Sequence, residues 1–185
     1  MPHVLDNDTL INTVRQWVEQ LVIGYNLCPF AKRELVRERV RFVVSRAQDE
    51  EQLLVDLENE LTLLGADEGI ETTLLITPQV LQDFFDFNQF LGRADQRVAQ
   101  LKLKGVFQLA SFHPDYQFGG TEPDDAENYT NKSPYPVLHL LREASLDRAI
   151  ENYPDAESIP EHNIEQLELM GSDQLRRLLE DCFNR

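Results

Sequence analysis

The sequence is poor in the residues that build disulfide frameworks, zinc sites and membrane spans. Its two cysteines, Cys28 and Cys182, are too few for a disulfide scaffold or a four-ligand zinc site. No apolar run approaches the roughly 20 residues of a membrane helix, and the first residues lack the basic and apolar stretches of a signal peptide. We therefore expect a cytoplasmic protein with reduced thiols and no membrane partner.

Positive charge and nucleotide-binding motifs are also scarce. The chain has 17 Lys and Arg against 33 Asp and Glu, and its net charge of -16 argues against general nucleic-acid binding. Neither G-x-G-x-x-G nor G-x-x-x-x-G-K-[ST] occurs, and no cofactor is indicated. Between residues 32 and 46, however, six basic residues accompany only two acids. This basic segment suits either a small anionic ligand or ion pairs with the surplus acids.

What the sequence does contain is typical of one globular domain. Its 185 residues are 42% hydrophobic and 27% charged. We expect a single domain over residues 1–185, with an α/β core over 1–113. An ordered rim loop over 114–136 and a helical part over 137–185 would complete it.

Hydrophobic periodicity predicts the fold class. The 3.6-residue spacing of apolar side chains predicts an N-terminal helix over 10–22 and two longer helices over 49–65 and 77–104. Alternating or β-branched stretches predict strands over 39–46, 70–77 and 106–112. This order predicts an α/β fold with a small, three-stranded, largely parallel sheet (a βαβαβ core) packed by helices. A helix from Val137 to about Ile150 and two short helices should follow.

The carboxyl ends of the expected strands are where a ligand pocket should form. Arg46 and His113 stand at two of these ends. Cys28 precedes Pro29 at the expected start of a short helix, which favours a reactive thiolate at the same edge. The alternatives are a core thiol for Cys28 and a hydrogen-bonded core imidazole for His113.

Two further groups of residues are candidates for the same site. His139, Arg142 and Glu143 would share one face of the expected helix, where a metal pair and a simple intrahelical hydrogen bond are both possible. The rim loop carries short polar side chains that suit either fixing the loop or binding a polar ligand. These loop residues are Asn128, Asn131, Ser133 and Tyr135.

Four segments resemble a known family. They are GYNLCPFA (24–31), SFHPDYQF (111–118), DDAENYTNKSPYP (124–136) and HLLREAS (139–145). Together they are similar to the bacterial and plastid family catalogued as domain of unknown function 1415, over nearly the whole chain. The resemblance implies no activity, but the family's hallmark segments contain the rim residues named above. These are Cys28, His113, Asn128, Asn131, Ser133, Tyr135, His139 and Arg142.

Three functional hypotheses follow. The first is an enzyme acting on a small anionic metabolite, with Cys28, His113 and His139 as catalytic candidates. Arg46, Arg142 and the four polar loop residues would bind its substrate. The second is a metal or haem protein that uses His113 and His139, although no ligand spacing indicates a structural metal. The third is a non-catalytic module that binds a partner protein.

Overall fold

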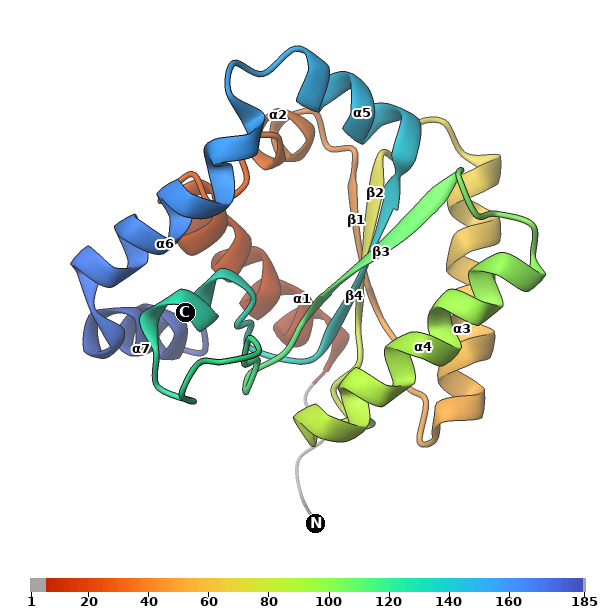
Figure 1. Cartoon of the computed structure of the whole chain (residues 1–185). Coiled ribbons are helices and arrows are strands. Elements are labelled where there is room, and N and C mark those ends of the chain that lie inside the picture. The colour runs from red at the N-terminus through yellow and green to blue at the C-terminus, as the bar shows by residue number, and fades with distance from the viewer. Residues whose placement is uncertain (1–5, 185) are drawn as a thin grey trace.

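One four-stranded sheet with helices on both faces forms the centre of the protein (Figure 1). The computed structural model describes residues 6–184. Across the sheet the strand order is β1-β2-β4-β3. The strands are β1 (Val40–Val44), β2 (Thr72–Ile76), β3 (Phe107–Phe112) and β4 (Val137–Arg142).

The sheet is mixed. β1 pairs with β2 in parallel, whereas β4 is antiparallel to both β2 and β3. β1, β2 and β3 therefore run in one direction and end at the same edge of the sheet. The α/β class is confirmed and the three expected strands are present. The sheet differs from the expected three-stranded, largely parallel one because it contains a fourth, antiparallel strand, β4.

The prediction of a helix from Val137 was wrong for its first six residues. Residues 137–142 form β4, and only Glu143–Glu151 form a helix, α5. Leu138, Leu140 and Leu141 are compatible with either structure, because a short apolar run cannot separate a buried helix from a central strand. Pairing with strands on both sides decides the conformation of this segment, and no local signal reports that pairing.

Two helical layers cover the sheet. The helices are α1 (Asn7–Trp17) with its π-helical continuation η1 (Val18–Ile23), α2 (Ala31–Val36), α3 (Glu50–Ala66), α4 (Phe84–Gln100), α5, α6 (Ile159–Met170) and α7 (Ser172–Asp181). Two short 3-10 turns are η2 (Ala126–Thr130) and η3 (Ala156–Ser158). Apolar side chains of α3 and α4 pack on one face, here called the α3 face. Those of α1, η1, α6 and α7 pack on the other, the α1 face.

Aspartate caps set where the long helices begin. The carboxylate of Asp49 accepts the N–H of Gln52, and α3 begins at Glu50 as expected. Asp83 caps α4 in the same way, so this helix begins at Phe84 and not at Thr77. Leu81, with φ of 59°, has a left-handed backbone conformation that interrupts any helix begun earlier.

None of the helices within residues 6–184 has the combination of length and apolar character that crossing a bilayer requires.

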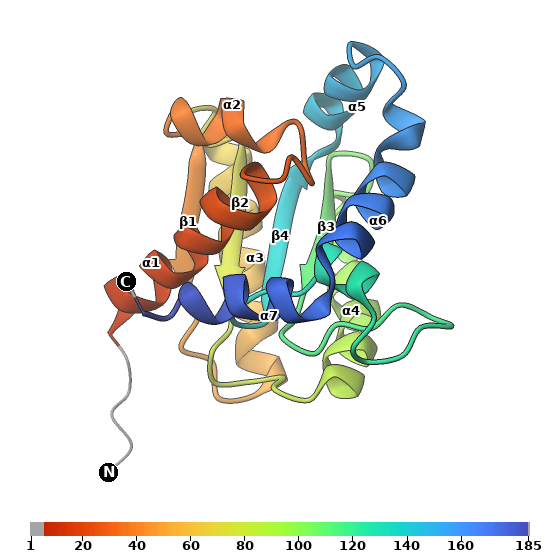
Figure 2. The same cartoon turned by 90° about the vertical axis from the view of Figure 1, so that its left-hand side faces the viewer.

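Figure 2 shows α2 at the edge of the sheet where β1 begins, and α7 near the edge where β1, β2 and β3 end.

Arg142 lies at the far edge of the sheet from the expected pocket. As the last residue of the antiparallel strand β4, it pairs with Phe107, the first residue of β3. Its Nη2 donates to the carbonyls of Leu64 (2.6 Å), Ile70 (2.9 Å) and Asp67 (3.0 Å), and its Nε also donates to Ile70. The guanidinium thus satisfies carbonyls at and beyond the end of α3, which is a structural position.

Arg142→Ala should therefore lower the free energy of unfolding by roughly 2–3 kcal/mol, because several partly buried carbonyls lose a charged donor. Urea denaturation measures the change. Arg148→Ala, which removes an exposed arginine bonded to Ser145, is the matched control and should cost less than about 0.5 kcal/mol. Equal losses in the two variants would show that Arg142 is not structural.

Candidate functional site

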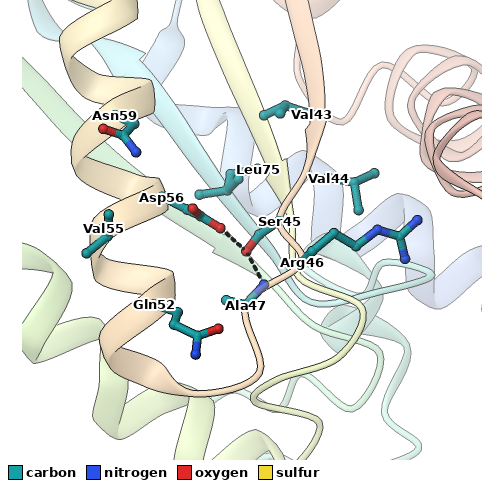
Figure 3. A pocket seen from close by; sticks show the side chains of 10 residues that line it. All are labelled: Val43, Val44, Ser45, Arg46, Ala47, Gln52, Val55, Asp56, Asn59 and Leu75. Carbon is teal, nitrogen blue, oxygen red and sulfur yellow. Dashed lines mark hydrogen bonds between the residues drawn. The ribbon is translucent and has the colours of Figure 1, made fainter.

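A groove lies where β1 ends and α3 begins (Figure 3). Its volume is about 460 Å³, within the range of small-ligand sites. One wall is the chain over 43–47, and the floor includes Leu75 of β2. The other wall consists of α3 residues spaced so that they share one helix face: Gln52, Val55, Asp56 and Asn59.

The groove holds a hydrogen-bonded pair of polar side chains. Ser45, which is 3% exposed, donates its hydroxyl to Asp56 Oδ2 at 2.5 Å and accepts the N–H of Ala47 at 3.1 Å. Both partners fix the orientation of the hydroxyl. Within the described chain Asp56 Oδ1 has no hydrogen bond, and the side chain is only partly buried. The groove therefore offers a carboxylate oxygen that can accept from a ligand.

Arg46 lies at the expected edge but does not turn its charge toward Asp56. Its side chain extends away from α3 in Figure 3 and donates to Asn7 Oδ1 at the start of α1. Other arginines of the basic segment pair with acids: Arg41 with Glu60 at 2.7 Å, and Arg39 with Glu71 at 2.7 Å. For Arg39 and Arg41, the structure thus supports ion pairs with the surplus acids, one of the two interpretations of the basic segment.

His113 is a buried side chain on the α3 face. Its Nε2 lies 3.1 Å from the carbonyl of Leu81, and its Nδ1 accepts the N–H of Asp115 at 3.0 Å. The ring packs against Phe84 and Phe87. Burial lowers the pKa of His113 and favours the neutral imidazole. Both ring nitrogens are occupied by the backbone, which is the arrangement of a core histidine.

His139 lies in the middle of β4 on the α1 face, opposite Leu74 of β2. The Thr72 hydroxyl donates to the Leu140 carbonyl at 2.7 Å, so at 2.6 Å it accepts from His139 Nε2. This leaves Nδ1 as an acceptor with no hydrogen bond in the described chain. Burial lowers the pKa of His139 to about 4, so the ring is neutral at pH 7 and a weak base.

An unpartnered indole lies near His139. The Phe112 ring is 6.1 Å from the His139 ring and 5.0 Å from that of Trp17, measured between centroids. Trp17 is 1% exposed, and its Nε1 has no hydrogen-bond partner among the described residues. Trp17 belongs to the α1-face core, which accounts for its burial beside these rings.

Cys28 lies on the α1 face, in the turn before α2. Asn163 of α6 donates to the carbonyl of the neighbouring Leu27 at 2.8 Å, and Leu27 belongs to the α1-face core. The N-cap of α2 is Phe30, not Cys28 as expected. Burial raises the pKa of the Cys28 thiol, and this outweighs the opposing effect of the N–H groups of Phe30 and Ala31.

The three catalytic candidates do not form one cluster. Cys28 and His139 lie on the α1 face, whereas His113 packs against α4 on the α3 face. Figure 2 places α2 where β1 begins, while His113 follows the end of β3. The expectation that Cys28 and His113 share one edge is therefore wrong.

The same geometry bears on the metal hypothesis. His113 and His139 project from opposite faces of the sheet, and both nitrogens of His113 are bonded to the backbone. Across residues 6–184, no three His, Cys, Asp or Glu side chains lie close enough to hold an ion. The structure thus gives no support to a metal or haem shared by these two histidines.

Two asparagines of the rim segment stabilise its fold. Asn128 is fully buried; its Oδ1 accepts from the Phe118 N–H and the Thr121 hydroxyl, both at 2.9 Å, and its Nδ2 donates to the Glu122 carbonyl at 2.7 Å. Asn131 donates to the carbonyl of Ser111 at 2.9 Å. These bonds occupy the polar groups of Asn128, so the loop-fixing alternative describes it best.

Ser133 and Tyr135 are also engaged within the protein. The buried Ser133 hydroxyl donates to the carbonyl of Tyr135 at 2.6 Å. The Tyr135 ring packs edge-on against Phe183 at 5.5 Å, and burial raises the pKa of its phenol. Lys132 of the same segment donates to the Pro123 carbonyl at 2.9 Å, and its Nζ lies 4.8 Å from the centroid of the Tyr129 ring. The rim segment is thus stabilised largely by its own side chains.

Sequence reasoning missed the groove residues Ser45 and Asp56. Ser45 directly precedes Arg46 at the strand end, so the rule that selected Arg46 also applies to its neighbour. Asp56 lies seven residues beyond the cap Asp49, and two helical turns bring it back to the same side of α3. Nothing local indicates that this side faces β1.

Comparisons with known proteins identify a family and no closer relative. The model of the family described as "Protein of unknown function (DUF1415)" matches residues 9–177. No curated protein matches, and no solved structure matches.

The pKa of His139 predicts a pH effect on stability. Its folded-state pKa of about 4 lies below the ordinary 6.5, so the unfolded chain binds more protons between these values. The free energy of unfolding should be highest above pH 6.5 and decrease toward pH 4. His139 should account for on the order of 2–3 kcal/mol of this decrease. Urea denaturation from pH 4 to 8 should show a smaller fall for His139→Gln. The matched control is His162→Gln, at an exposed histidine, and it should follow the wild type.

The two thiols should differ in reactivity. Cys28 is half-buried, while Cys182 is fully buried and its Sγ donates to the Leu178 carbonyl at 3.3 Å. At pH 7.5 iodoacetamide should modify Cys28 before Cys182, but more slowly than it modifies free glutathione, because burial disfavours the thiolate. Mass spectrometry of the folded protein follows both sites. Modification of Cys28 faster than glutathione would contradict the raised pKa.

Proposed function

The chain belongs to the DUF1415 family, whose description gives no activity, and we propose that it is a ligand-binding protein whose site is the β1–α3 groove. The observation that carries this proposal is the Ser45–Asp56 pair inside a groove at the carboxyl end of a strand. Loops and helix starts at such edges are where open α/β sheets bind their ligands.

Asp56 sets the chemistry of the ligand. It is the only carboxylate that lines the groove within the described chain, and the guanidinium of Arg46 points away from it. A free carboxylate oxygen accepts from ammonium, guanidinium or hydroxyl groups and repels anions. The groove thus favours a cationic or hydroxyl-bearing group, whereas the sequence led us to expect an anionic metabolite.

Binding has more support here than catalysis. The hydroxyl of Ser45 is held by Asp56 and Ala47, and among residues 6–184 the groove is lined by no histidine, cysteine or second carboxylate. General acid–base catalysis uses a side chain positioned to accept or donate a proton, and Asp56 is already engaged by Ser45. An enzymatic role for Cys28, His113 or His139 stays a prediction for each residue separately.

Three small probes of matched size test the proposal: propylammonium, 1-propanol and propionate. Chemical shifts of the Ser45 and Ala47 amides should respond to propylammonium with a dissociation constant on the order of 10 mM, less to propanol and least to propionate. Asp56→Asn keeps the side-chain size and an acceptor for Ser45, and should weaken propylammonium binding roughly tenfold.

Asp95→Asn is the matched control, since Asp95 is an exposed acid of α4 outside the groove. It should leave the titration unchanged. Tighter binding of propionate than of propylammonium at Ser45 and Ala47 would overturn the assignment and favour the anionic ligand.

A further inference from the structure

Among residues 6–184, β1 is an edge strand whose outer side has no paired strand. In the sheet it pairs only with β2. The N–H of Ser45 donates to Ile76, and the carbonyl of Arg39 accepts from Glu71, so odd-numbered residues direct their backbone groups toward β2. By alternation, the N–H and C=O groups of Val40, Phe42 and Val44 point outward. The bonds found among residues 6–184 provide no partner for them.

This outer side is continuous with the groove. Val44 lines the groove, but its side chain packs against the α1-face core. The part of Val44 that borders the groove is therefore its backbone. Across the groove Val55 of α3 is 54% exposed, and Val43 and Leu75 add apolar surface. An edge strand beside a helix with apolar surface between them can take up an extended chain as an additional strand.

We propose that the occupant of the groove is an extended peptide segment of a partner protein, which adds to β1 as a fifth strand. The proposal rests on the function proposed above and names its ligand class. Backbone hydrogen bonds to Val40, Phe42 and Val44 hold the peptide. An apolar side chain contacts Val55, and a Lys or Arg side chain donates to Asp56.

Charge distinguishes this occupant from a second copy of the chain. Each chain carries a net charge of -16, so two copies repel one another, whereas a basic peptide is attracted. β1 is also short, with Arg39 just before it and Arg41 at its second position, features that limit indiscriminate strand pairing. These two arginines are paired with Glu71 and Glu60, so their charge is compensated within the protein. The Asp56 carboxylate beside this short edge strand therefore favours a basic segment of a partner protein.

The probe is a capped pentapeptide, acetyl-Thr-Val-Thr-Lys-Thr-amide, in which Val and Lys project to the same side of an extended chain. It should bind with a dissociation constant below about 1 mM and shift the amides of β1. N-methylation blocks backbone donors on one edge of an extended peptide. One peptide is N-methylated at Val and Lys, and a second is N-methylated at the three Thr residues. One of the two should bind roughly tenfold or more weakly than the unmodified peptide, and the other should keep its affinity.

A matched pair of variants tests the protein side. Val44→Pro removes an outward N–H at an edge position where proline is tolerated, and should weaken peptide binding roughly three- to tenfold. Val44→Ala loses a similar amount of packing but retains the N–H, so it should bind the peptide more tightly than Val44→Pro does. Both variants should respond to propylammonium, which reports an intact Asp56.

The possible outcomes separate the two proposals. If propylammonium binds but the peptide does not, or if both methylated peptides bind equally, strand addition is overturned while the groove remains a binding site. If neither probe binds, both proposals fail. Sedimentation would assign the edge to a second copy of the chain if the wild type and Val44→Ala are dimers and Val44→Pro is a monomer. That result would overturn the peptide proposal.

Discussion

The insertion of β4 between β2 and β3 is the constraint on which the rest of the structure depends. β4 is hydrogen-bonded on both sides, and Val137, Leu138 and Leu140 are fully buried. Its antiparallel direction places Val137 beside Phe112, so β3 and β4 form a hairpin joined by residues 113–136. A connection this long is stable only when its own polar groups are satisfied, and Asn128 and Ser133 supply those bonds.

The same strand decides how far apart the chemically reactive side chains lie. Alternation along β4 directs His139 to the α1 face, while His113, just beyond β3, packs against α4 on the α3 face. The direction of β4 carries Arg142 to the far edge, where it satisfies carbonyls at the end of α3. The candidate residues Cys28, His113, His139 and Arg142 are thereby distributed over two faces and two edges of the sheet.

β4 also leaves β1 at the margin. β1 pairs with β2 alone among the described strands, and the groove beside it is lined by one face of α3. The groove there combines an apolar floor, one available carboxylate oxygen and outward backbone groups. These features suit recognition by shape and hydrogen bonding more than covalent chemistry, since the thiol and the imidazoles lie elsewhere.

By itself the sequence determined the α/β class, the positions of β1, β2 and β3, the extent of α3 and membership of the family, because periodicity is a local property. It also indicated that the carboxyl edge of the sheet should hold a site, and Arg46 does line the groove there. Only the tertiary structure decided that residues 137–142 form a strand, that His113 is satisfied by backbone groups, and that Asp56 faces Ser45. Each of these depends on which segment pairs or packs with which across dozens of residues. No local pattern encodes that choice when an apolar run such as Val137–Leu141 suits either a helix or a strand.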